Sequence, residues 1–219
     1  MTQPPCQLYL ISPQDVGGSF PERLARALDA QVGSGPVAAF QFRVKGLDDH
    51  AAATLAEPLR RICADRDCSF IVNDSITLAK RLGADGVHLG QSDGSVAEAR
   101  AALGREAQIG VTCHASRHMA LEAGEAGADY VAFGAFFESP TKPSEHRPEL
   151  DILEWWQTFF ELPCVAIGGI TPENCAPLVR AGADFLAVSH AVWGPGSEAG
   201  AGSDEAAAVA AFHRAIAEA

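Results

Sequence analysis

The chain has 219 residues, of which 47% are hydrophobic and 20% charged, and this globular composition excludes a disordered or fibrous protein. Its net charge of −12 argues against a nucleic-acid or anionic-membrane partner, because such surfaces attract basic proteins. We find no apolar run of the ~20 residues that a membrane span needs and no basic-then-apolar leader. We therefore expect a protein without a membrane span or signal peptide, located in the cytoplasm.

Short apolar segments with strand character alternate with stretches of helical spacing along the chain. The expected strands are Leu8–Ser12, Ala38–Val44, Ser69–Asn73, Gly86–Gly90, Gln108–Cys113, Tyr130–Phe136, Cys164–Gly168 and Phe185–Ala191. The clearest expected helices are Pro21–Ala30, Asp49–Asp67, Gly94–Leu103, Ser116–Ala126, Thr171–Ala181 and Ser203–Ala217. Thr171 is expected to cap its helix, with Pro172 in the first turn.

A Gly-Ala-Asp sequence followed by an apolar run begins at Gly83, Gly127 and Gly182. Glycine suits the end of a helix, and the run that follows suits a buried strand. Eight strand–helix units in about 220 residues leave two architectures, a closed barrel and an open doubly wound sheet. The number of units and the even composition favour a single-domain (βα)8 barrel over residues 1–219.

Polar residues gather where the expected strands end, which is where βα barrels carry their chemistry. Gln41, Arg43 and Lys45 alternate along one strand, so they share a face and point into the mouth of the barrel. Two cations on an inward face are costly to bury unless an anion meets them, so this trio predicts an anion site. The alternative is a strand end that emerges into solvent.

Two acidic residues, Asp74 and Asp93, follow the third and fourth expected strands. One or two carboxylates together with substrate phosphate are the usual ligands of Mg²⁺. The alternative is that both residues cap the helices that follow them. At the seventh strand, Gly168 and Gly169 offer bare backbone N–H groups that suit a phosphate.

The chain has six cysteines, of which Cys63 and Cys68 form a pair separated by four residues. No second cysteine pair or histidine pair follows at the spacing of a zinc site. We interpret them as small buried hydrophobic residues of a reducing compartment.

The chain resembles the thiamine phosphate synthase family from about residue 8 to residue 193. The resemblance is carried by Gln-Phe-Arg-Val-Lys at 41–45, Asn-Asp at 73–74, Gly-Val-His-Leu-Gly-Gln-Ser-Asp at 86–93, Gly-Val-Thr-Cys-His at 110–114, Thr-Lys at 141–142 and Ile-Gly-Gly-Ile at 167–170. It implies a transferase that joins hydroxymethylpyrimidine diphosphate to thiazole phosphate and releases diphosphate, with Mg²⁺ as cofactor. The implied partners are small molecules alone, and the resemblance leaves homo-oligomerisation open.

The resemblance also implies roles for individual residues. Arg43, Lys45 and Lys142 would act on the leaving diphosphate, and Asp74 and Asp93 would hold Mg²⁺. The substrate-binding candidates are Gln41, Asn73, Thr112, His114, Ser139, Thr141, Gly169, Ser189 and His190. Thr112 stands where the family usually has serine, and Ser139 and Thr141 where it has two threonines at the thiazole phosphate.

Two departures from the family pattern keep other functions open. Ser75 stands where the family usually has arginine, and Ser189-His190 where it has an apolar residue and serine. One alternative is a thiazole tautomerase-like isomerase with His114 as general base. The other is a non-catalytic barrel that binds a phosphate ligand. Because Ser75 cannot supply the charge of the missing arginine, we expect His190 to act as a phosphate-binding cation.

Overall fold

A closed parallel barrel forms the centre of the molecule. The structure, a computed structural model, describes residues 5–30, 37–138, 147–194 and 204–219. Its strands are β1 (Gln7–Ile11), β2 (Ala39–Phe42), β3 (Ser69–Asn73), β4 (Gly86–Leu89), β5 (Gln108–His114), β6 (Tyr130–Gly134), β7 (Cys164–Ile167) and β8 (Phe185–Val188). They pair in chain order, and β8 pairs with β1. The predicted (βα)8 barrel is confirmed, and the open sheet is excluded.

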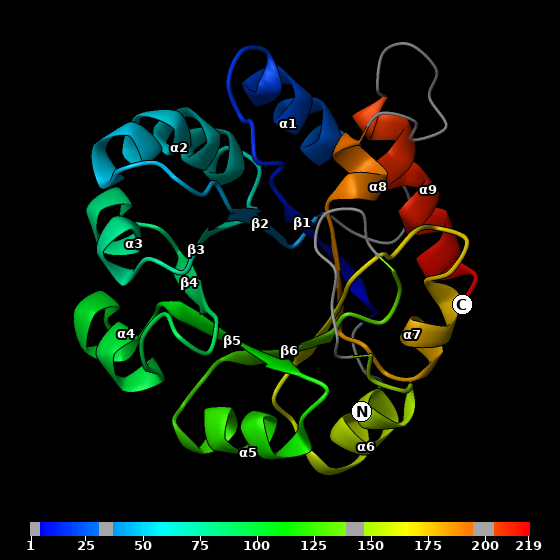
Figure 1. The fold of residues 1–219 in the computed structure, drawn as a ribbon. Helices are drawn as coiled ribbons and strands as arrows, with labels where there is room; N and C mark the ends of the chain where they lie inside the picture. The colour runs from blue at the N-terminus through cyan, green and yellow to red at the C-terminus, as the bar shows by residue number, and fades with distance from the viewer. Residues whose placement is uncertain (1–4, 31–36, 139–146, 195–203) are drawn as a thin grey trace.

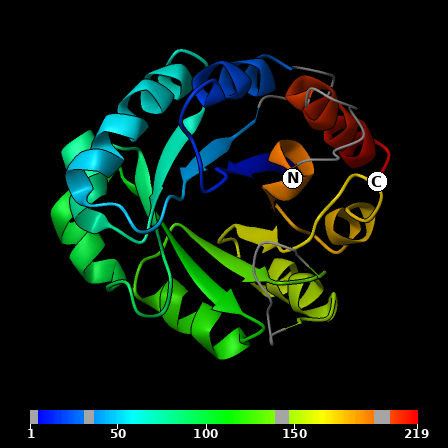
Figure 2. The same cartoon turned by 45° about the horizontal axis from the view of Figure 1, so that its top comes forward.

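Helices surround the strands in chain order, from blue to red in Figure 1. They are α1 (Phe20–Asp29), α2 (Asp49–Ala64), α3 (Ile76–Leu82), α4 (Val96–Leu103), α5 (Arg117–Glu125), α6 (Asp151–Phe159), α7 (Ala176–Arg180), α8 (His190–Trp193) and α9 (Glu205–Ala217). Helix α9 packs against α1 and completes the ring. The tilted view of Figure 2 shows this ring enclosing the strands.

Buried side chains fill two separate layers. In the outer layer, residues such as Phe40 and Phe42 of β2 pack between the strands and the helices. A smaller cluster inside the barrel includes Tyr9 and Tyr130. Because side chains alternate along a strand, Gln41 points inward between its outward neighbours and donates a hydrogen bond to the Tyr9 hydroxyl. The predicted inward direction of Gln41 is therefore confirmed.

The Gly-Ala-Asp repeat locks each of its strands to the preceding one. The three glycines have φ values of +59°, +89° and +100°, which suit a chain leaving a helix. The aspartates then accept hydrogen bonds from backbone N–H groups at the start of the neighbouring strand. These bonds join Asp85 to Phe70 (2.7 Å), Asp129 to Ile109 (2.7 Å) and Asp184 to Cys164 (2.8 Å).

Two expected boundaries at the end of the chain are wrong. Helix α7 begins at Ala176 and not at Thr171, whose N–H instead donates to the side chain of Asn174 in a turn (2.8 Å). Pro177 occupies the first turn of α7. Proline suits the first turn of any helix, so the sequence did not show whether the helix begins before Pro172 or before Pro177. Strand β8 ends at Val188 where Phe185–Ala191 was expected, because the following apolar residues form α8.

Candidate functional site

Three polar residues lie at the carboxyl end of β2. The strand ends at Phe42 and not at Val44 as expected, so Gln41 is within it while Arg43 and Lys45 follow it and do not continue its alternation. The N–H of Arg43, directly after β2, donates to the Ser12 hydroxyl (2.9 Å), which ties the ends of β1 and β2 together. The ammonium group of Lys45 lies 3.3 Å from a carboxylate oxygen of Asp74, which follows β3. Arg43 is half-buried and Lys45 is exposed, so an anionic ligand from solution can contact both side chains.

The carboxylates of Asp74 and Asp93 do not cap helices. Ser75 caps α3 by accepting from the N–H of Leu78 (3.1 Å), and Ser95 caps α4 by accepting from the N–H of Glu98 (3.2 Å). The capping alternative is therefore wrong. Asp93 instead accepts from the N–H of Gly90 (3.1 Å), which leaves oxygen atoms of both carboxylates available near the ends of adjacent strands β3 and β4.

A chain of hydrogen bonds crosses the interior of the barrel beneath this mouth. Gln41 donates to the hydroxyl of Tyr9 (3.0 Å), and that hydroxyl lies 2.8 Å from the hydroxyl of Tyr130. Nδ1 of His88 lies 3.1 Å from the Tyr130 hydroxyl, and its Nε2 lies 2.8 Å from the Thr112 hydroxyl. The chain thus links two of the predicted substrate-binding residues, Gln41 and Thr112.

Sequence reasoning did not assign a role to Tyr9, His88 or Tyr130. The alternation of side chains along each strand could have predicted that these three residues point into the barrel, because each occupies an inward position of a short strand. All three are at least 93% buried. Burial lowers the pKa of His88 to about 4, against a smaller opposite effect of Asp93, and raises the pKa of Tyr9 to about 12. At neutral pH the buried histidine and both tyrosines are therefore uncharged.

We expect His88 to make the fold sensitive to acid. The unfolded chain protonates this histidine below about pH 6.5, whereas the folded chain does so only near pH 4, so stability falls as the pH drops between these values. Between about pH 7.5 and pH 5 the expected loss is about 2 kcal/mol. Urea unfolding at both pH values checks this difference.

The matched comparison is His88→Gln, whose stability is expected to fall by about 2 kcal/mol less over the same interval. His118→Gln, a change on the exposed face of α5, serves as the control and should follow the wild type. Burial also lowers the pKa of His213, and this contribution is common to all three proteins and cancels. Equal pH dependence in wild type and His88→Gln would contradict the assignment.

The predicted residues Asn73, Thr112 and His114 all lie at strand ends on this side of the barrel. Asn73 is the last residue of β3 and is paired in register with His88. The register of β5 against β6 shifts between Thr112 and His114, so these two residues do not follow simple alternation. All three are partly exposed, as a ligand contact requires.

The two glycines after β7 allow the loop after β6 to approach closely. A Cβ atom on Gly169 would lie 2.2 Å from the carbonyl oxygen of Glu138, and one on Gly168 would lie 2.3 Å from Cβ of Ala135. The Gly-Gly pair thus has a packing reason that the sequence did not reveal. Its predicted role in phosphate binding stays a prediction, and the helix expected directly after it begins only at Ala176.

The residues after β8 lie beside the end of β1. Ser189 precedes α8, and its hydroxyl donates to the carbonyl of Ser12 (3.4 Å). His190 is the first residue of α8 and is exposed, so its side chain is open to a ligand. Three further predicted residues, Ser139, Thr141 and Lys142, lie outside the described residues.

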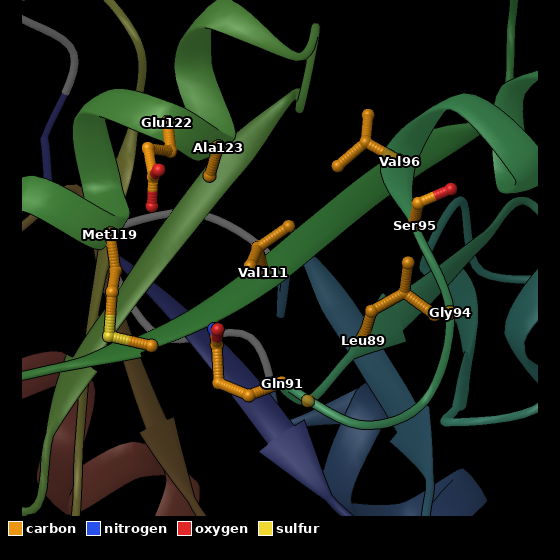
Figure 3. A pocket seen from close by; sticks show the side chains of 10 residues that line it. Leu89, Gln91, Gly94, Ser95, Val96, Val111, Met119, Glu122 and Ala123 are labelled. Atoms are coloured by element: carbon orange, nitrogen blue, oxygen red, sulfur yellow. The ribbon is translucent and has the colours of Figure 1, made fainter.

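A separate hollow of about 170 Å³ opens between α4 and α5 (Figure 3). Met119, Glu122 and Ala123 of α5 face Ser95 and Val96 across it. None of the predicted catalytic, substrate-binding or metal residues lines it. We therefore place the candidate site at the strand ends and not in this hollow.

The six cysteines are all buried and free, which confirms their structural interpretation. Burial raises the pKa of Cys113 to about 12, so this thiol stays protonated. Within the described ranges, no three His, Cys, Asp or Glu side chains are grouped as metal ligands. No helix in those ranges is long and apolar enough to cross a membrane.

A parallel βα barrel with charged and amide side chains at its strand ends is the arrangement in which βα-barrel enzymes carry their active sites. Residues 8–192 match the family model described as thiamine monophosphate synthase. The chain therefore belongs to the thiamine phosphate synthase family, whose members are transferases.

Individual relatives of this family match the chain over nearly its full length. It is 68% identical to the thiamine-phosphate synthase of Erythrobacter litoralis, over 100% of this chain and 99% of that protein. It is 50% identical to the thiamine-phosphate synthase of Rhodospirillum centenum, over 95% of this chain and 97% of that protein. The structure of thiamine phosphate pyrophosphorylase from Pyrococcus furiosus superposes on this one with a TM-score of 0.80 and 29% sequence identity. The superposition covers 97% of this chain and 96% of that protein.

Proposed function

We propose that this protein joins hydroxymethylpyrimidine diphosphate to thiazole phosphate and releases diphosphate. The bond between the pyrimidine methylene carbon and the diphosphate oxygen breaks, and the diphosphate takes the electron pair. The thiazole nitrogen then donates its lone pair to that carbon and forms the new C–N bond. The observation that carries the proposal is the 68% identity to a thiamine-phosphate synthase over the whole chain, together with the retained cations at the mouth.

Arg43, Lys45 and Lys142 would stabilise the charge that grows on the departing diphosphate. Such groups lower the barrier when they are held at the place where charge develops. The fixed backbone of Arg43 and the pairing of Lys45 with Asp74 support this role. Gln41 and Asn73 would bind the pyrimidine and diphosphate, with the amide of Gln41 held by Tyr9.

Asp74 and Asp93 fit a Mg²⁺ ion that takes its remaining ligands from diphosphate. Both are half-buried carboxylates, and one or two of these suffice for this ion when phosphate completes the shell. Bound there, the ion would neutralise charge on the diphosphate oxygens. With Mg²⁺ present, Lys45 would turn from Asp74 toward the diphosphate.

The thiazole phosphate would be bound on the opposite side of the mouth. Ser139, Thr141 and the backbone of Gly169 are its proposed contacts, with Ser189 and His190 beside them. Two of the described residues support this arrangement, since Gly169 lies against the loop after β6 and His190 is exposed. Thr112 and His114 would contact the substrates from β5.

We expect diphosphate to bind more tightly in the presence of Mg²⁺, and we expect Asp93→Asn to remove most of this gain. Asp93 is the sharper target, because changing Asp74 would also release Lys45. Asparagine keeps an acceptor for the N–H of Gly90 and removes only the charge. Calorimetric titration of diphosphate with and without Mg²⁺ measures the gain.

The control for this titration is Glu106→Gln, which removes an exposed charge away from the strand ends. It should behave as the wild type does. Equal diphosphate affinity with and without Mg²⁺ in the wild type would overturn the metal assignment.

Residues 1–219 would act as one barrel domain in the cytoplasm. The packing of α9 on α1 supports the single domain, because it closes the ring with the last helix of the chain. Six free thiols support a reducing compartment.

A further inference from the structure

The five buried or half-buried side chains Gln41, Tyr9, Tyr130, His88 and Thr112 form a continuous hydrogen-bonded chain across the barrel. Four of them are no more than 7% exposed, so a polar hydrogen without an acceptor there is costly. Each hydroxyl has only one proton to donate, and a neutral imidazole has one N–H. These limits leave two possible directions for the chain of hydrogen bonds, and a group whose role is fixed at one end decides between them.

The contact of Gln41 sets this direction. Its amide nitrogen can only donate, so the Tyr9 oxygen accepts and the Tyr9 proton is free to be donated to Tyr130. Tyr130 can then donate only to an unprotonated Nδ1 of His88.

The N–H of the imidazole must then be on Nε2, where it donates to the Thr112 hydroxyl. In the opposite direction Tyr130 would donate to Tyr9, and the Tyr9 proton would have no acceptor among these five side chains. His88 is uncharged in either direction, because burial lowers its pKa.

We propose that this chain positions the substrate by fixing the Gln41 carbonyl oxygen as a hydrogen-bond acceptor and the Thr112 hydroxyl as a donor. Because the Gln41 nitrogen is held by Tyr9, its oxygen points away from that hydroxyl. Because Thr112 accepts from Nε2, its proton is available to another partner. Tyr9, Tyr130 and His88 are then positioning residues, and this inference rests on the proposed function.

The first test is the protonated ring nitrogen of His88 in the ¹⁵N-labelled full-length protein. Two-bond ¹H–¹⁵N spectra distinguish the two neutral forms, and His88→Gln identifies the signals by their loss. We expect the Nε2–H form alone in the wild type and also in Tyr9→Phe, where Nδ1 of His88 is still the acceptor for the Tyr130 proton. A wild-type Nδ1–H form would overturn the proposal, and this result does not depend on activity.

The second test is steady-state kinetics of Tyr9→Phe with both substrates. We expect the KM for the pyrimidine diphosphate to rise about tenfold, with the KM for thiazole phosphate unchanged, because Gln41 loses the group that orients it. Tyr130→Phe should act in the same direction and provides a second variant if one folds poorly.

The matched control is Trp156→Phe, which removes a buried hydrogen bond to the carbonyl of Leu162 (2.6 Å) in the outer layer. It should lower the melting temperature without changing either KM. If Tyr9→Phe and Trp156→Phe give the same KM values as the wild type, the chain does not position substrate. If the wild type itself has no turnover, the proposed function fails, while the spectra still decide the direction of the chain.

Discussion

Replacing Arg43 by alanine is expected to lower kcat/KM by a factor of about 100 to 1,000, mostly through kcat, as the loss of one electrostatic contact in a transition state does. Arg43 is half-buried at the end of β2, and its backbone N–H is fixed by the Ser12 hydroxyl. A positioned guanidinium can bind two phosphate oxygens at once. Steady-state rates with both substrates varied give the separate effects on kcat and KM.

Two further variants define the origin of the effect. Arg43→Lys keeps the charge and loses the planar pair of donors, so we expect an intermediate rate. Lys80→Ala removes an exposed cation from α3 and should leave the rate unchanged. If Arg43→Ala raises KM and leaves kcat unchanged, Arg43 only binds substrate and its role in the transition state is contradicted.

Replacing Glu205 by alanine is expected to lower the free energy of unfolding by about 2–3 kcal/mol. This carboxylate at the start of α9 is fully buried and pairs with Arg23 and Arg26 of α1. Breaking a buried ion pair costs about 3–5 kcal/mol, and the two arginines recover part of this because their side chains are 23% and 55% exposed.

Urea unfolding at neutral pH measures this loss. Asp29→Ala is the control. Asp29, also on α1, pairs at the surface with Arg66, which follows α2, and the loss of this pair should cost less than about 1 kcal/mol. A smaller loss for Glu205→Ala than for Asp29→Ala would contradict the view that this buried ion pair stabilises the contact between α1 and α9.

The strands were predictable because local chemistry determines them. Each Gly-Ala-Asp turn ends one helix and begins one strand, and the apolar runs that follow are too short for anything but a strand. The errors fell where two local solutions are equally good. Pro172 and Pro177 both suit a first helical turn, and the residues Ala191–Trp193 continue an apolar run although they form a helix.

The mouth of the site was predictable in part, and the interior below it was not. Alternation along β2 correctly predicted that Gln41 points inward. The contact between Tyr9 and Tyr130 joins residues 121 positions apart, and no local pattern reveals such a pair. Tyrosine and histidine in a strand also resemble ordinary strand residues, so only the closed barrel shows that they meet.

The most direct test of the account is product formation by the purified protein supplied with both substrates and Mg²⁺. We expect thiamine phosphate and diphosphate to form in equal amounts and neither product to form when one substrate is omitted. Conversion of the thiazole substrate alone, or binding of both substrates without any product, would contradict the proposed reaction.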